Sequence, residues 1–144
     1  MKSSEQMLQA EPLARAGGDA LADLHRAAQE CESACIVCAD ACLAEEEVAS
    51  LRRCIRTDLD CADACWAAAR ILARRTEAVT EVLRGQVMGL EAASRVCAEE
   101  CERHAGDHQH CRACAESCRR CERACLSALR AVAVMLPLAV VSHS

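Results

Sequence analysis

The sequence predicts an all-α protein, an up-down-up-down four-helix bundle in which cysteines line one half of the core. Three observations support this fold class. The 144 residues are 53% hydrophobic but include one Trp and no Phe or Tyr, a composition that favours helix over sheet. The 14 cysteines recur mostly at spacings of three and four residues, which is the period of one helix face. Capping and helix-breaking residues divide the chain into four segments of similar length.

The first half of the chain contains a polar lead and two expected helices. Residues 1–18 form the lead, which ends in Gly17-Gly18 and has room for one short helix. Asp19 is a suitable N-cap for a helix that runs to about residue 48. Ser50 is the expected cap of a second helix, which runs to about residue 75.

The second half of the chain contains two further helices and a tail. The third helix is expected over about 76–105, before the break at Gly106-Asp107. The fourth runs from about residue 108 to residue 136, where Pro137 ends it because proline lacks the backbone N–H that a helix interior needs. Residues 137–144 form a C-terminal tail, so the bundle itself spans 19–136. Short loops make consecutive helices antiparallel neighbours.

Each expected helix carries its cysteines as a stripe on one face. Asp58 occupies the position at which the stripe of the second helix lacks a cysteine, and His104 and His108 continue the stripe of the third. The stripes consist of Cys31, Cys35, Cys38 and Cys42 in the first helix; Cys54, Cys61 and Cys65 in the second; Cys97 and Cys101 in the third; and Cys111, Cys114, Cys118, Cys121 and Cys125 in the fourth.

The bundle topology brings all of these thiols to one end. The first and third helices carry cysteines in their C-terminal halves, and the second and fourth carry them in their N-terminal halves. The loops that follow the first and third helices lie at the same end of such a bundle, so the thiols collect in one half of the interior. An aliphatic plug is expected to close the other half, formed by Leu21, Leu24, Ile71, Leu72, Leu83, Val87, Leu90, Val132 and Met135.

Charge, apolar runs and motifs limit the class of function. A formal net charge of −5 argues against tight nucleic-acid binding. The longest apolar run, 131–141, contains Pro137 and is too short for a membrane span. The N-terminal residues lack the apolar segment of a secretory signal, so we expect a cytoplasmic protein with reduced thiols. We expect no enzyme activity, because no phosphate loop, dinucleotide fingerprint or nucleophile–base pattern is present.

Reduced thiols on four facing helices favour Cu(I), a soft ion that accepts bridging thiolates. Cys111 to Cys125 cover about 21 Å of helix, a length that suits many ions better than one. Zinc is a rival, because Cys111-x-x-Cys114 and Cys118-x-x-Cys121 have zinc-site spacing, although they leave ten cysteines unexplained. An iron–sulfur motif ending in Cys-Pro is absent. Cysteine as a small core residue explains one or two thiols rather than 14.

The three histidines allow two interpretations, and the carboxylate on the stripe of the second helix has a separate expected role. His104, His108 and His110 are either solvated loop residues or the place where an ion is first captured, at the open end of the thiol-lined interior. Asp58 is expected to face this open end, since a buried unpaired carboxylate is costly, and to guide cations there. On the second interpretation, ions enter and leave at the histidine end.

The cysteine ladders have a distinctive form: Cys31-x3-Cys35-x2-Cys38-x3-Cys42, Cys54…Cys61-x3-Cys65, Cys97-x3-Cys101-x2-His104…His108-x-His110, and Cys111-x2-Cys114-x3-Cys118-x2-Cys121-x3-Cys125. In this pattern the chain resembles the bacterial copper storage proteins over about residues 19–135. The resemblance implies a cysteine-lined four-helix bundle that holds many Cu(I) ions, a homotetramer, and the cytosolic branch with histidines at the open end. Asp58 and the sparse cysteines of the third helix depart from the pattern.

Three functions remain open from the sequence. The first is storage of Cu(I), exchanged with copper-donating and copper-accepting ligands. The second is a thiol redox buffer or sensor, and the third is a copper chaperone or zinc-binding module. Stoichiometry separates them, because storage requires on the order of ten ions per chain and a chaperone about one or two.

Overall fold

The computed structural model describes residues 6–7, 18–74 and 80–142, and the side chains of 6–7, 20–74 and 80–133. Within residues 18–74 and 80–142 it contains four long α-helices and one short 3-10 helix. No strand occurs in these residues, so the predicted all-α class is confirmed. The elements are α2 (Gly18–Leu43), η1 (Val48–Leu51), α3 (Arg52–Ala73), α4 (Thr80–His104) and α5 (Gln109–Ser142).

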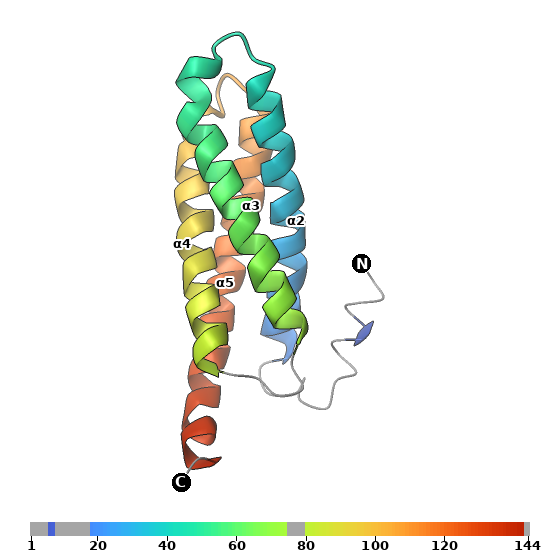
Figure 1. The fold of residues 1–144 in the computed structure, drawn as a ribbon, viewed down its shortest axis with the longest axis vertical. Helices are drawn as coiled ribbons and strands as arrows, with labels where there is room; N and C mark the ends of the chain where they lie inside the picture. Colours follow the sequence, from blue (N-terminus) through green and yellow to red (C-terminus); the bar gives the residue numbers. More distant parts are fainter. Residues whose placement is uncertain (1–5, 8–17, 75–79, 143–144) are drawn as a thin grey trace.

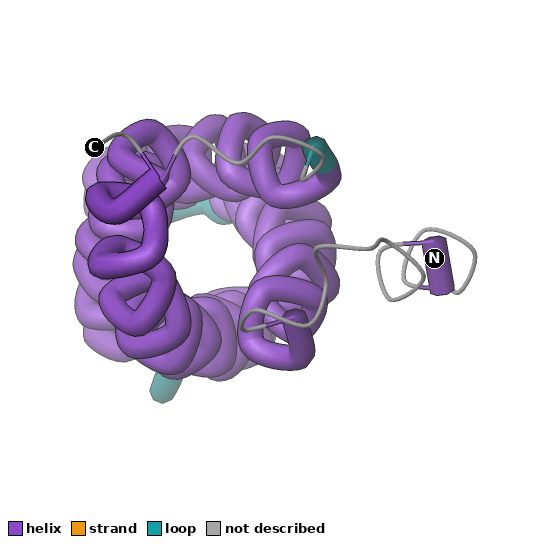
Figure 2. The backbone as a smooth tube through the Cα atoms, turned by 90° about the horizontal axis from the view of Figure 1, so that it is seen from below, coloured by secondary structure: helices purple, strands orange, loops and turns teal. Residues whose placement is uncertain are grey.

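The four helices stand side by side, and the α2–α3 and α4–α5 connections meet at one end of the bundle (Figure 1). Each helix packs mainly against two neighbours: α2 and α4 both lie against α3 and α5. Seen along the bundle axis, the helices form a ring around a common core (Figure 2). This arrangement is the predicted up-down-up-down bundle.

The connection after α2 differs from the prediction. The helix ends at Leu43, and η1 intervenes before α3 begins at Arg52. Ser50 does not cap α3, because its hydroxyl donates to the backbone carbonyl of Glu47 at 2.8 Å. The fully buried Leu51 anchors this connection in the core instead.

The prediction that the last helix ends before Pro137 is wrong, because α5 continues to Ser142. Proline removes one backbone donor and displaces the carbonyl four residues earlier. Figure 1 shows that this part of α5 projects beyond the other helices. A carbonyl freed in a projecting segment can bond to water, which lowers the cost of continuing the helix.

The core divides along the bundle axis into a thiol half and an aliphatic half. All 14 cysteines are at most 1% exposed. Ser94 lies one turn before Cys97 on the same face of α4, and its buried hydroxyl donates to the carbonyl of Leu90 at 2.8 Å. Of the predicted plug, Ile71 is partly buried, the side chain of Met135 lies outside the described residues, and the buried members are Leu21, Leu24, Leu72, Leu83, Val87, Leu90 and Val132.

Candidate metal centre

The thiols point inward from all four helices because steps of three and four residues keep them on one face of each helix. No disulfide joins any of the 14 cysteines, all of which belong to the described part of the chain. The thiol half of the core is therefore a continuous lining of free sulfurs, buried from solvent. We call this lining the thiol chamber, and the end that carries the α2–α3 and α4–α5 connections its open end.

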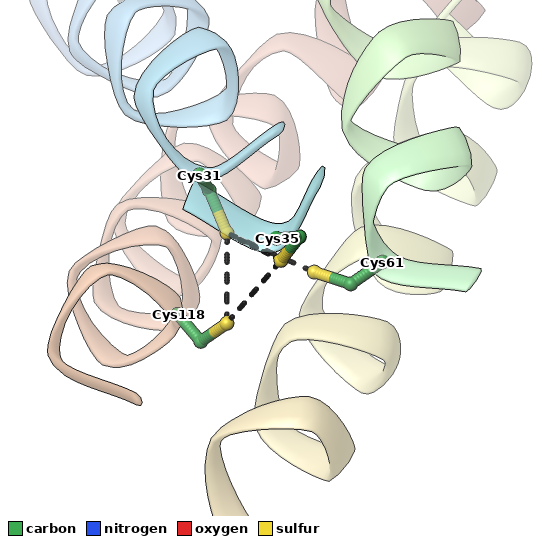
Figure 3. A group of neighbouring side chains, drawn as sticks. All are labelled: Cys31, Cys35, Cys61 and Cys118. Carbon is green, nitrogen blue, oxygen red and sulfur yellow. Dashed lines mark hydrogen bonds between the residues drawn. The ribbon is translucent and has the colours of Figure 1, made fainter. Parts of the chain in front are cut away.

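One group of four thiols shows how the helices combine. Cys31 and Cys35 of α2 face Cys61 of α3 and Cys118 of α5 (Figure 3). The sulfur of Cys31 lies 3.7 Å from those of Cys61 and Cys118, and the sulfurs of Cys35 and Cys118 are also 3.7 Å apart. Two sulfurs each about 2.3 Å from a tetrahedral ion would be about 3.8 Å apart. The group has the dimensions of a thiolate metal site without any rearrangement of the backbone.

Neighbouring groups share members along the bundle axis. Cys35 and Cys118 also lie within 4.8 Å of Cys97 and Cys114, measured between ligand atoms. A sulfur that belongs to two groups can bridge two ions, which is a bonding pattern that soft d¹⁰ ions accept. The lining therefore offers a chain of overlapping sites.

Asp58 lies within this chain, and the expectation that it faces the open end is wrong. It is fully buried, and the thiols of Cys97, Cys114 and Cys101 donate to its Oδ1 at 3.1, 3.3 and 3.5 Å. Burial raises the pKa of the Asp58 carboxyl to about 10. The carboxyl is thus neutral near pH 7 in the metal-free protein, and the S–H donors replace the water that the sequence prediction required.

The outermost group consists of Cys38, Cys42, Cys54 and Cys111, whose sulfurs all lie within 4.8 Å of one another. Burial raises the pKa of the Cys42 thiol to about 12, and burial also raises the pKa of the Cys111 thiol well above its usual range. These thiols are therefore protonated in the metal-free protein at neutral pH. Metal binding must displace their protons, because the thiolate is the ligand.

His110 joins this outermost group. Its Nδ1 lies 3.5 Å from the sulfur of Cys38 and 3.6 Å from that of Cys111, and the two sulfurs are 4.0 Å apart. The point equidistant from these three atoms is about 2.1 Å from each, close to the metal–nitrogen and metal–sulfur bond lengths of about 2.0–2.3 Å known for zinc. One nitrogen and two sulfurs thus form a ready three-coordinate site at the open end.

The other two histidines of the open end contact carboxylates. Nε2 of His104 lies 3.0 Å from Glu100, and His108 lies 3.4 Å from Glu45 through Nδ1 and 3.2 Å from Glu47 through Nε2. Glu100 is buried and also pairs with Arg53 and Arg103 at 3.2 Å. The contacts of these acidic residues with the histidines were not predicted from the sequence. Glu100 precedes His104 by four residues, a helical spacing that could have indicated the pair, whereas Glu45 and Glu47 are brought to the histidines by the fold.

The donor set decides which chemistry the centre supports. Thiolate sulfur, with imidazole nitrogen at one end, suits soft ions such as Cu(I) much better than hard ions such as Mg²⁺ or Ca²⁺.

No helix of the described residues has the length and apolar character needed to cross a membrane.

Comparisons with known proteins agree with this geometry. The family model described as "Copper storage protein" matches residues 18–130. A copper storage protein of Streptomyces lividans, solved with 10 copper equivalents, superposes with a TM-score of 0.86 at 43% identity, covering 89% of this chain and 98% of that one. A structure of a cytosolic copper storage protein from the same organism, with five coppers, superposes with a TM-score of 0.77 at 47% identity. The match covers 78% of this chain and 93% of that one.

A curated relative has been less fully described. The uncharacterized cysteine-rich protein YhjQ of Bacillus subtilis is 36% identical over 98 residues, which cover 68% of this chain and 85% of that protein. The family match spans most of the chain, including the whole thiol chamber. The chain is a member of the copper storage protein family.

Proposed function

We propose that this protein stores many Cu(I) ions inside its thiol chamber. The observation that carries the proposal is the continuous lining of buried, unpaired thiols whose sulfurs stand at metal-sharing distances in overlapping groups. A single structural or catalytic ion needs about four ligands. Overlapping groups of bridging sulfurs instead support a capacity on the order of one ion per cysteine.

We assign the storage ligands to all 14 cysteines and add Asp58 and His110, whose ligand atoms lie among the thiols. His104 and His108 complete the open end, where ions enter and leave. Among the residues whose side chains the structure describes, the buried members of the aliphatic half are hydrocarbon side chains such as Leu24, Leu90 and Val132, which offer no ligand for a soft ion, and they close the other end. The bundle thus has one route for ions, and the plug stabilises the fold with or without copper.

The cellular setting follows from the ligands. Fourteen free thiols require a reducing compartment, which favours the cytoplasm, and the Streptomyces lividans relative is described as cytosolic. The partners are copper-donating and copper-accepting ligands, and a homotetramer is what the family resemblance implies. The thiols that line the chamber are at most 1% exposed, which suits the holding of ions better than contact with an organic substrate, and we assign no enzyme activity.

The decisive experiment is anaerobic titration of the reduced, metal-free protein with Cu(I), with free copper reported by a chromophoric chelator. Storage predicts binding of on the order of ten or more ions per chain before free copper appears. Saturation at about one or two ions would instead indicate a chaperone or a structural site.

A parallel titration separates storage from redox buffering. A redox buffer needs thiols that oxidants can reach, whereas these thiols are at most 1% exposed. The folded, metal-free protein should react slowly with a colorimetric disulfide reagent, and all 14 thiols should react after denaturation. Rapid reaction of most thiols in the folded protein would favour the redox function.

A further inference from the structure

The open end contains a chain of contacts that leads to the outermost thiols from the loop after α2. We call this loop, which carries Glu45, Glu46 and Glu47, the acidic loop. Glu45 lies in the turn after α2, where its backbone N–H donates to the carbonyl of Cys42 at 3.2 Å. One oxygen of its carboxylate, Oε1, lies 3.2 Å from Nε2 of His110 and 3.4 Å from Nδ1 of His108. The turn therefore holds one carboxylate between two histidine rings, whose centroids are 5.3 Å apart.

We propose that Glu45 is a positioning residue, which holds His110 so that its Nδ1 takes copper from the open end and passes it to the outermost thiols. This inference rests on the proposed storage function. It assigns unequal roles to the three histidines, and it places a carboxylate that binds no copper at the start of the route.

The hydrogen bond fixes which ring nitrogen faces the chamber. A carboxylate only accepts hydrogen bonds, so the contact with Glu45 keeps a proton on Nε2 of His110. Nδ1 is then the nitrogen with a lone pair for a metal, and it is the atom that faces Cys38 and Cys111. A partner on the second ring nitrogen is how proteins commonly orient metal-binding histidines.

Burial explains why this ring matters for uptake. Cys38 and Cys111 are at most 1% exposed, whereas the side chain of His110 is 21% exposed. His110 is therefore a potential ligand that reaches both solvent and the thiols. His108 has a carboxylate at each ring nitrogen, so we assign it to holding the acidic loop rather than to binding copper.

The test uses the full-length, reduced, metal-free protein with Cu(I) delivered from a chromophoric Cu(I)–chelator complex. With less than one equivalent of copper per chain, stopped-flow absorbance reports the rate of first capture, and a separate titration reports capacity. We expect Glu45→Ala and His110→Ala to slow first capture by about tenfold, the low end of the effect of removing a supporting hydrogen bond in metal sites. Capacity should remain near that of the unsubstituted protein in Glu45→Ala.

Three matched variants separate positioning from simple attraction of a cation. Glu46→Ala removes the same charge from the same loop at an exposed residue that makes no contact with the histidines, and it should change the rate less than twofold. Glu45→Gln removes the charge but keeps an oxygen acceptor, so it should retain most of the capture rate. Adding Glu45→Ala to His110→Ala should slow capture no further.

The nitrogen assignment has its own readout. A two-bond ¹H–¹⁵N correlation spectrum of the metal-free protein should show Nε2 of His110 protonated, and the ring should lose this fixed state in Glu45→Ala. Three results would overturn the proposal. The first is an Nε2 of His110 without a proton in the unsubstituted protein, and the second is an unchanged capture rate in Glu45→Ala. The third is that Glu45→Ala slows capture in the His110→Ala background as much as it does in the unsubstituted protein. A capacity of one or two ions would contradict the storage function itself, which the capacity titration reports independently of the capture rates.

Discussion

Replacing Asp58 by Asn should make the metal-free protein more stable. Asp58 is fully buried among thiols, and burial raises its pKa to about 10 from a reference value of 3.8. Near pH 7 the folded protein therefore keeps this proton, whereas the unfolded chain has lost it. The folded state binds more protons over the whole interval between the two pKa values, so its stability falls as the pH rises.

The size of the effect follows from the same interval. About three pH units separate the unfolded pKa of 3.8 from pH 7, and each unit corresponds to about 1.4 kcal/mol. Asp58 thus costs the metal-free protein about 4 kcal/mol near neutral pH. Asn has the same shape and cannot ionise, although its N–H groups find only weak sulfur acceptors. We expect Asp58→Asn to raise the free energy of unfolding by about 2–4 kcal/mol.

The assay is urea unfolding of the reduced, copper-free protein, followed by far-ultraviolet circular dichroism at several pH values between about 5 and 7. The difference between the two proteins should grow by about 1.4 kcal/mol per pH unit, because all other groups cancel in the comparison. Asp60→Asn is the matched control on α3: this carboxylate is exposed and paired with Arg56, so its loss should change stability by less than about 1 kcal/mol. Equal stability of Asp58→Asn and the unsubstituted protein at both ends of the pH range would refute the reasoning.

The remaining predictions concern the plug, the fold without metal and the open end. Leu90→Ala should lower the free energy of unfolding by about 2–5 kcal/mol in denaturant titrations, yet leave copper capacity unchanged, because Leu90 is fully buried in the aliphatic half. The metal-free, reduced protein should keep its helical circular dichroism, and loss of that signal would contradict a plug that acts without copper. Raised pKa values keep thiols such as Cys42 protonated in the metal-free protein, so copper loading should release protons, which a pH indicator in weak buffer can measure. For the same reason, the apparent Cu(I) affinity measured by competition with a chelator should decrease as the pH falls. Replacing His104, His108 and His110 together should slow uptake and removal while capacity changes little, because the cysteines hold most of the ions. A large loss of capacity at normal rates would contradict a role of these histidines in entry.

Much of the fold could be predicted from the sequence because helix periodicity is a local property. The step from Cys31 to Cys35 fixes a shared face whatever surrounds the helix, and the same holds for Cys118 and Cys121. Loop order then placed the thiols at one end and Leu24 and Leu90 at the other, as the structure has them. Local signals were less reliable at helix ends, where Ser50 caps no helix and α5 passes through Pro137.

The contacts between helices were decided only by the tertiary structure. Which thiols share a site depends on how far each helix slides and rotates against its neighbours, so the group of Cys31, Cys61 and Cys118 could not be read from spacing alone. Asp58 showed the same limit: its burial is tolerable because thiols from α4 and α5 donate to it, and no pattern within α3 reports them. Glu45 reaches His110 across 65 positions of sequence because two connections meet at one end of the bundle. A sequence records which side chains one helix presents on a face, whereas metal sites and their supporting hydrogen bonds require atoms from several helices to meet within a few ångströms, and that packing is a property of the whole fold.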